Sequence, residues 1–455
     1  MKHDILINPE APFASCKLNR KIYADVLTEV VVCNKEGFVM ALNSGWGTGK
    51  TTFVKMWQYH LELEGLKTIY FNAWENDFED NALTALVGEL NPIVIPASQE
   101  SFKKVLKSGL MISKHILPAI VKGLISKHID SESIREVLDE ITDDSKDLFK
   151  QEVEEYGNRK EQIKEFKLSL AKFIADTAGP NPIVFIVDEL DRCRPSYAVS
   201  LLEQIKHFFS VPNIVFVLSM NKGQLEHAIK GTYGSENIDA DEYLRRFIDI
   251  EYSLPTPDAN LFADYLYEYY QLSEVFEGKH SEMIGNDKTS FLRVIHFVFK
   301  RKEITLRQQE KVFAHIATVL KTCLDKRQIF PVLFVTLVYL KLIHRDIYNN
   351  IRIKSYSIGQ LQKKLLAVFP KNEDEIGDLI AIESIMIVFY SKFLDPNLQL
   401  IKYSDHSGQK YLEFPSAYDD IRLMKALCSL MEARYNFQVD SIDKIIARID
   451  LLSRD

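Results

Sequence analysis

FVMALNSGWGTGKTT, residues 38–52, is the stretch of the sequence that decides the fold. It begins with an apolar run that is typical of a buried strand. A cluster of three glycines ends that run, and apolar residues then recur at helical spacing over residues 51–63. The stretch therefore predicts a strand, a tight loop and a helix in direct succession.

The glycine-rich loop has the chemistry of a phosphate-binding site, the Walker A motif. Glycines let successive backbone N–H groups turn toward a phosphate, and the positive end of the following helix adds to the attraction. We expect Lys50 to reach the β- and γ-phosphates and the Thr51 hydroxyl to bind Mg²⁺. Ser44 replaces the usual first glycine, and the alternative is a turn that binds no ligand. The predicted cofactor-binding residues are Gly45, Trp46, Gly47, Thr48, Gly49, Lys50, Thr51 and Thr52.

A second motif supplies the carboxylates that such a site needs. Residues 184–189, VFIVDE, form an apolar strand that ends in two acids. Asp188 is expected to hold Mg²⁺ through a water, and Glu189 to act as the general base on the attacking water. An acidic strand end alone is common in α/β folds. Combined with the upstream loop, it predicts a P-loop NTPase with this strand as Walker B.

Alternating strands and helices predict an α/β fold with a mainly parallel sheet. The stretch between the second and third strands, about residues 80–180, looks helical and is too long for an ordinary crossover. It therefore predicts a helical insertion between Walker A and Walker B. The further strands are expected at residues 68–73, 182–187, 213–218 and 247–254.

The C-terminal part of the chain has a different pattern. From about residue 260 no clear strand appears, and apolar residues recur at helical spacing. Residues 329–340 read as a buried core helix, and the polar segment 277–290 is the candidate linker. We therefore expect a nucleotide domain over residues 1–280 and an all-helical region over residues 281–455.

Composition narrows the class of protein. The 455 residues are 46% hydrophobic and 26% charged, and the net charge of −8 argues against a surface that binds nucleic acid throughout. Five scattered cysteines without a Cys-x-x-Cys pair indicate reduced thiols. The N-terminus lacks the apolar part of a signal peptide, and no uncharged stretch reaches the ~20 residues of a membrane helix. We expect a cytoplasmic protein for which a nucleic-acid partner is not indicated.

These residues and their neighbours resemble the KAP family of P-loop NTPases over about residues 17–257. The marks are GWGTGKT at 45–51, FNAW at 71–74 and DELDRC at 188–193. The resemblance implies ATP as the nucleotide and a three-layer sandwich with an extra strand between the two Walker strands. Bacterial members of the family occur in phage-exclusion systems, so a role in anti-phage defence follows by analogy only.

Two departures from the family pattern bear on function. Many members carry transmembrane helices between the Walker motifs, whereas the lysines of the insertion here indicate a soluble or at most membrane-peripheral segment. Residues 102–127 form a basic amphipathic pattern that suits an anionic membrane surface; the alternative is a helix packed on the protein with its lysines in water. Glu189 stands where relatives often have Asp, which favours turnover.

Four side chains outside the Walker motifs are further candidates. Asn221 follows the fourth strand, where it would sense the γ-phosphate; the alternative is a helix or turn cap. Arg245 and Arg246 resemble the arginines of AAA-type ATPases that contact a neighbour's γ-phosphate; the alternative is a solvated pair. Arg307 opens a helix with a capping-box pattern and resembles a second-sensor arginine, with a solvent-facing residue as the alternative.

Three residues beside the motifs have open roles. Trp74 is expected to pack in support of the phosphate loop, and the alternative is a platform that stacks on the nucleotide base. Asp191 and Arg192 either pair within the chain or reach across a subunit boundary.

The sequence as a whole predicts an Mg²⁺-dependent ATPase. Hydrolysis would drive a change in the helical C-terminal region or in a protein partner bound there, and the two adjacent arginines favour a homo-oligomer with a shared site. The rival function is a nucleotide-gated oligomeric scaffold that binds ATP with negligible hydrolysis. The choice of ATP over GTP rests on the resemblance alone.

Overall fold

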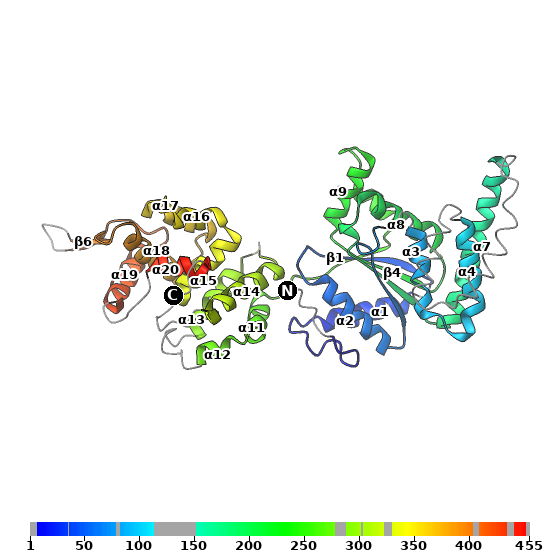
Figure 1. Cartoon of the computed structure of the whole chain (residues 1–455), viewed down its shortest axis with the longest axis horizontal. Coiled ribbons are helices and arrows are strands. Elements are labelled where there is room, and N and C mark those ends of the chain that lie inside the picture. Colours follow the sequence, from blue (N-terminus) through cyan, green and yellow to red (C-terminus); the bar gives the residue numbers. More distant parts are fainter. Residues whose placement is uncertain are drawn as a thin grey trace. The chain divides into compact units, whose positions relative to one another are not determined.

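The computed structural model describes residues 7–34, 36–78, 82–112, 152–277, 288–301, 304–322, 330–403, 409–434 and 441–451. The chain divides into two compact units, Met1–Thr256 and Pro257–Asp455. Figure 1 shows the helices and strands of the two units.

The first unit is built on a parallel sheet of five strands in the order β2-β3-β4-β1-β5. Strand β4 lies between β1 and β3, so the extra strand expected between the two Walker strands is present. Every residue of β3 and β4 is buried, as expected for strands that are covered on both faces. The strands are β1 (Phe38–Asn43), β2 (Lys67–Asn72), β3 (Ile183–Asp188), β4 (Ile214–Met220) and β5 (Ile250–Ser253).

Helices cover both faces of this sheet (Figure 1), which confirms the three-layer sandwich. On one face α1 (Lys21–Cys33) and α2 (Lys50–Leu63) bury their apolar residues against alternate side chains of the strands. On the other face a separate apolar cluster joins the sheet to the remaining helices. These are α3 (Ala82–Gly88), α4 (Gln99–Ile112), α7 (Glu152–Ala178), α8 (Pro195–Phe208), α9 (Lys222–Tyr233) and α10 (Ala240–Arg245).

The described part of the predicted insertion, residues 82–112 and 152–178, is helical as expected. Phe102 of α4 packs on Phe173 of α7, with the ring centres 5.3 Å apart, and Val105 is buried beside them. The apolar face of α4 is therefore covered by protein. This agrees with the alternative of a helix packed on the protein rather than one lying on a membrane surface. Residues 113–127 of the predicted amphipathic segment lie outside the described residues. Among the helices of the described ranges, none has the length and apolar character to cross a bilayer.

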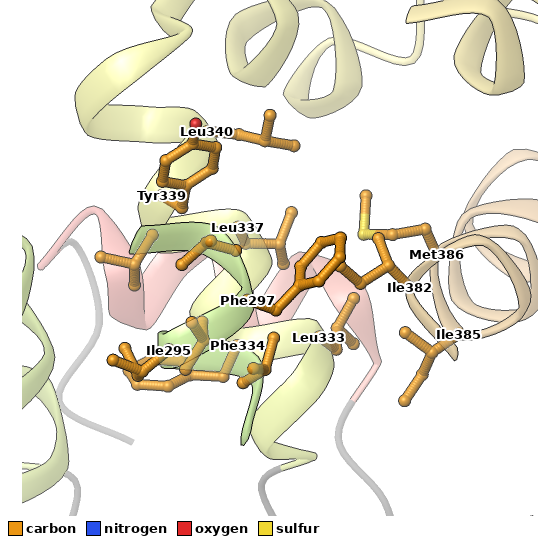
Figure 2. Packing of buried hydrophobic residues seen from close by; sticks show 14 of the residues in the cluster. Ile295, Phe297, Leu333, Phe334, Leu337, Tyr339, Leu340, Ile382, Ile385 and Met386 are labelled. Carbon is orange, nitrogen blue, oxygen red and sulfur yellow. The ribbon is translucent and has the colours of Figure 1, made fainter. Parts of the chain in front are cut away.

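The second unit is helical around one apolar core. Figure 2 shows how α13, α15 and α18 meet there through residues such as Phe297, Leu333 and Met386. The central helix α15 begins at Pro331, and its residues 333–340 are all buried, as the sequence predicted for the segment 329–340. The helices are α11 (Ala259–Tyr269), α12 (Leu272–Glu277), α13 (Lys288–Phe299), α14 (Leu306–Thr322), α15 (Pro331–Ile343), α16 (Arg345–Arg352), α17 (Ile358–Val368), α18 (Ile376–Leu394), α19 (Asp420–Arg434) and α20 (Ile442–Ile449).

The second unit differs from the expectation in two respects. It contains an antiparallel pair of short strands, β6 (Ile401–Tyr403) and β7 (Lys410–Leu412), so it is not entirely helical. The units also divide after Thr256, whereas the boundary predicted from the sequence lies near residue 280. The reason is that α11 and α12 bury Leu266 and Phe276 in the core of the second unit. Residues 278–287 of the predicted linker lie outside the described residues.

Candidate functional site

The predicted phosphate loop lies between β1 and α2. Gly47 and Gly49 take left-handed backbone conformations, with φ of 74° and 84°, which glycine adopts without strain. Thr48 Oγ1 donates to the carbonyl of Gly45 at 2.8 Å and lies 2.8 Å from Ser44 Oγ. Ser44, which replaces the usual glycine, therefore bonds within the loop rather than disrupting it.

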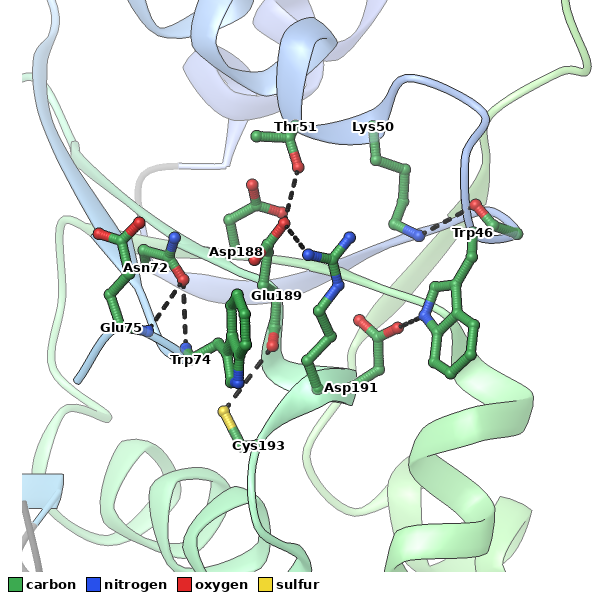
Figure 3. A network of polar contacts seen from close by, with 12 residues as sticks. Trp46, Lys50, Thr51, Asn72, Trp74, Glu75, Asp188, Glu189, Asp191 and Cys193 are labelled. Atoms are coloured by element: carbon green, nitrogen blue, oxygen red, sulfur yellow. Dashed lines mark hydrogen bonds and ion pairs between the residues drawn. The ribbon is translucent and has the colours of Figure 1, made fainter. Parts of the chain in front are cut away.

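Lys50 begins α2 and turns back onto the loop. Its Nζ donates to the carbonyl oxygens of Ser44, at 2.5 Å, and Gly45, at 3.3 Å (Figure 3). Burial lowers the pKa of Lys50, while the carboxylates of Asp191 and Asp188 oppose this shift. In the structure these two carbonyl bonds hold the ammonium group against the loop.

Asp188 ends β3 with a side chain that is suited to hold a metal. The residue is 1% exposed, and its Oδ2 accepts a bond of 3.0 Å from the Tyr70 hydroxyl. Its Oδ1 is buried and has no hydrogen-bond partner among the described residues. Burial, and then the charge of Asp188, raise the pKa of Tyr70, so the phenol remains a donor. A buried carboxylate oxygen without a partner is a free position for Mg²⁺ or for a water bound to it.

Glu189 follows Asp188 in a left-handed conformation, with φ of 61°, which is uncommon for a residue other than glycine. Its Oε1 accepts a bond of 2.7 Å from Arg192 and lies 3.5 Å from Thr51 Oγ1 (Figure 3). Burial raises the pKa of Glu189, and the positive charge of Arg192 opposes that shift. The structure therefore brings the predicted base and the predicted Mg²⁺ ligand Thr51 together.

The residues with open roles pair within the chain. The indole N–H of Trp46 donates to Asp191 Oδ2, and Arg192 binds Glu189. Trp74 is 50% exposed, and the Arg192 guanidinium lies 5.8 Å from the centre of its indole ring. Trp74 thus differs from the buried packing residue that was expected, because a charged group rather than the core covers it.

Residues 20–446 match the model of the KAP family P-loop domain. The chain belongs to the KAP family of P-loop NTPases. The match extends far beyond residue 257, where the resemblance recognised in the sequence ends, and includes helices of both units. No curated protein matches the chain.

Two solved structures are similar to this KAP protein at low scores. One is the Aeropyrum pernix ORC2 protein in ADPNP–ADP complexes, with a TM-score of 0.37, 12% identity, and coverage of 92% of this chain and 95% of that one. The other is a DNA replication initiation factor, with a TM-score of 0.31, 12% identity, and coverage of 98% and 97%. At these scores neither likeness carries a functional conclusion.

Of the remaining candidate residues of this KAP protein, Asn221 and Arg245 make local contacts in the structure. Asn221 caps α9, and its Oδ1 accepts a bond of 3.3 Å from the Gln224 amide, which is the capping alternative. Arg245 pairs with Asp241 at 2.9 Å. Arg246 is exposed, and its side chain makes no hydrogen bond or ion pair within the described ranges. Arg307 lies in α14 of the second unit, so its sensor role stays a prediction.

Two further residues of the site, Arg20 and Tyr70, were not predicted from the sequence. Arg20 is 3% exposed and donates to the carbonyls of Thr48, at 2.8 Å, and Gly49, at 3.2 Å. It precedes Thr48 by 28 residues and stands in none of the recognised motifs. Tyr70 lies within a predicted strand, and β2 pairs with β3 in the register Asn72↔Asp188. That register places Tyr70 near Asp188, but the sequence alone does not reveal it.

Proposed function

We propose that this KAP protein binds ATP with Mg²⁺ and hydrolyses it. The observation that supports this most strongly is the 3.5 Å approach of Thr51 Oγ1 to Glu189 Oε1, which joins Walker A and Walker B across the sheet. Both motifs lie at the carboxyl ends of parallel strands, where open α/β sheets bind their ligands. Family membership supports nucleotide binding, and the identity of the nucleotide rests on the resemblance.

The residues present fit the metal that this reaction uses. Thr51 would bind Mg²⁺ directly, and the partnerless Oδ1 of Asp188 would hold it directly or through a water. When bound, Mg²⁺ would neutralise charge on the β- and γ-phosphates. Lys50 would contribute a second positive charge there after leaving the carbonyls of Ser44 and Gly45.

Glu189 would take the proton from the attacking water. A raised pKa suits that role, because a base is most effective when its pKa approaches the working pH. In the structure Arg192 holds Glu189 at 2.7 Å, so the carboxylate must leave this ion pair, or share it, to accept a proton from water.

One observation favours the rival function, a nucleotide-gated scaffold with negligible hydrolysis. A carboxylate that accepts a charge-assisted hydrogen bond is a weaker base than a free one. If the Arg192–Glu189 pair persists after ATP binds, the protein would hold ATP and act through assembly instead of turnover. Measured turnover separates the two functions.

We further propose that the active form is a homo-oligomer with a shared site. Arg246 is the better candidate for a residue acting on a neighbour's γ-phosphate, because Arg245 is engaged by Asp241 and Glu242. An arginine delivered by a neighbour is worth ~10³–10⁵ in rate in related chemistry. A protein partner would bind through the helical C-terminal unit.

The cellular setting is also proposed. The described cysteines Cys16, Cys33, Cys193 and Cys428 are free thiols, which supports a reducing compartment such as the cytoplasm. A role in anti-phage defence rests on the family analogy. Loss of protection in a plaque assay with the Lys50→Ala variant would support that role, and equal protection by this variant would contradict it.

Nucleotide binding is tested by calorimetry with Mg²⁺-ATP on the wild type and on Lys50→Ala. We expect the variant to lose binding, because Lys50 is the main side-chain charge on the β- and γ-phosphates. Lys55, in the same helix but over the Tyr70 ring, provides the control Lys55→Ala, which should bind as the wild type does. Unchanged affinity in Lys50→Ala would refute the assignment of the loop.

A further inference from the structure

Arg20 is a buried cation that has no carboxylate partner among the described residues. The residue is 3% exposed, and it forms no ion pair with a carboxylate in the part of the chain that the structure describes. Its Nε is buried and has no hydrogen-bond partner there. Charged side chains are rarely buried unless they are paired, because desolvation penalises the charged form. Accordingly, burial lowers the pKa of Arg20.

The charge of Arg20 is directed at the phosphate loop. Its two terminal nitrogens donate to the carbonyl oxygens of Thr48, at 2.8 Å, and Gly49, at 3.2 Å. In a planar trans peptide the C=O and the next N–H point in opposite directions. Arg20 therefore lies on the side of the loop opposite to that toward which the N–H groups of Gly49 and Lys50 point. Hydrogen bonds in such a chain polarise one another, so the carbonyl bonds strengthen these N–H donors.

The segment that carries Arg20 is itself anchored to α2. Phe13 packs on Phe53 and on His60, with ring centres 6.3 Å and 5.9 Å apart. Thr28 of α1 accepts a bond of 3.0 Å from the Trp57 indole. These contacts hold residues 13–28 against the helix that follows the phosphate loop, and Arg20 is the one described side chain of this segment that bonds to the loop itself.

We propose that Arg20 is a positioning residue of the nucleotide site, whose buried charge is balanced when nucleotide phosphates occupy the loop. The proposal rests on the proposed nucleotide binding. An anion bound by the N–H groups of the loop attracts the guanidinium through the loop. This attraction offsets part of the free-energy cost of burying the charge of Arg20. By thermodynamic linkage, the contact of Arg20 with the loop raises the affinity for nucleotide, and bound nucleotide stabilises that contact by the same free energy.

The test compares Arg20→Met and Arg20→Lys with the wild type by calorimetric titration of ADP and ATP. Methionine has a similar length and no charge, and we expect Kd to rise by about tenfold or more, which is ~1.4 kcal/mol per tenfold. Lysine keeps the charge but lacks the forked guanidinium, so Arg20→Lys should lose less nucleotide affinity than Arg20→Met. The control is Lys21→Met, which removes an equal charge from the neighbouring, exposed position. Calorimetric stoichiometry counts the folded molecules, so lower stability alone does not change Kd.

Arg20→Met with the Kd of the wild type, or with the same small change as Lys21→Met, would overturn the proposal. If Arg20→Met does not fold, the proposal is tested instead by hydrogen exchange on the wild type, measured with and without ADP. ADP should slow exchange in residues 20–24 as well as in the phosphate loop. Protection of the loop with residues 20–24 unchanged would equally overturn the proposal. If the wild type binds no nucleotide at all, the proposed function fails instead.

Discussion

Arg192 controls two properties of Glu189, its position and its pKa. The ion pair of 2.7 Å holds the carboxylate, and the positive charge offsets part of the rise in pKa that burial causes. Arg192→Gln removes that charge, so the pKa of Glu189 should rise further. As the proposed base, Glu189 can accept a proton only when deprotonated, so activity should fall as pH falls through its pKa. The acid limb of kcat should therefore move to higher pH in the variant.

The matched control for this experiment is Arg194→Gln. Arg194 lies two positions further along, but its guanidinium pairs with Asp77 at 2.9 Å rather than with Glu189. The acid limb of kcat in Arg194→Gln should coincide with that of the wild type. An acid limb of Arg192→Gln at the wild-type position would show that Glu189 is not the group that titrates, or that Arg192 does not bind it during turnover.

At the residue scale, the sequence predicted the groups that stand inside motifs and missed those that act across the fold. Lys50, Thr51, Asp188 and Glu189 meet as their motifs indicate. The bond of Arg20 to the loop and that of Tyr70 to Asp188 depend on helix and strand packing, for which a single sequence carries no signal. These buried polar contacts are set by tertiary structure.

At the scale of elements, the position of β1 depends on Gly37. This residue has φ of 82°, and a Cβ there would lie 2.8 Å from the carbonyl oxygens of Val211 and Ile214. Gly37→Ala therefore combines backbone strain of ~1–2 kcal/mol with a clash against rigid backbone, and overpacking costs a further ~1–3 kcal/mol. Thermal unfolding of the full chain should show a clear loss of stability.

Gly65→Ala is the control for the clash. Gly65 has nearly the same φ, 79°, but a Cβ at this position has no atom within 4 Å. Gly65→Ala should therefore lose only as much stability as backbone strain costs, without the further loss that the clash causes in Gly37→Ala. Equal losses in the two variants would mean that the contact of Gly37 with the loop before β4 does not constrain the sheet.

The elements that the sequence predicted are those with a long, uniform pattern. β1, β3 and β4 are mainly apolar runs bounded by loops, and their bounds lie within two residues of those predicted. β5, a mixed and largely exposed run, is shorter than the predicted strand over residues 247–254. β6 and β7 were missed because three residues each, half of them exposed, are too few to show alternation. The unit boundary was misplaced because α11 and α12 have the same helical spacing whichever core they join.

At the scale of the whole molecule, the proposed homo-oligomer with a shared site can be tested by its dependence on protein concentration. If Arg246 acts on a neighbour's γ-phosphate, specific activity should rise with protein concentration, and ATP should shift the mass distribution upward. An Arg246→Ala chain mixed with a Lys50→Ala chain should recover some activity, because each supplies what the other lacks. Arg245→Ala is the comparison, since Arg245 is already paired within its own chain. A concentration-independent rate from a strict monomer would contradict the shared site.

The most direct test of the account is phosphate release from Mg²⁺-ATP by the purified wild type and by Glu189→Gln, with ATP affinity measured in parallel. The amide keeps the shape of the side chain but cannot accept the proton of the attacking water. We predict that the variant binds ATP with unchanged or tighter affinity and that its turnover falls by ~10²–10⁴. Equal turnover in the two proteins, or no measurable turnover in the wild type at any protein concentration, would contradict hydrolysis at this site.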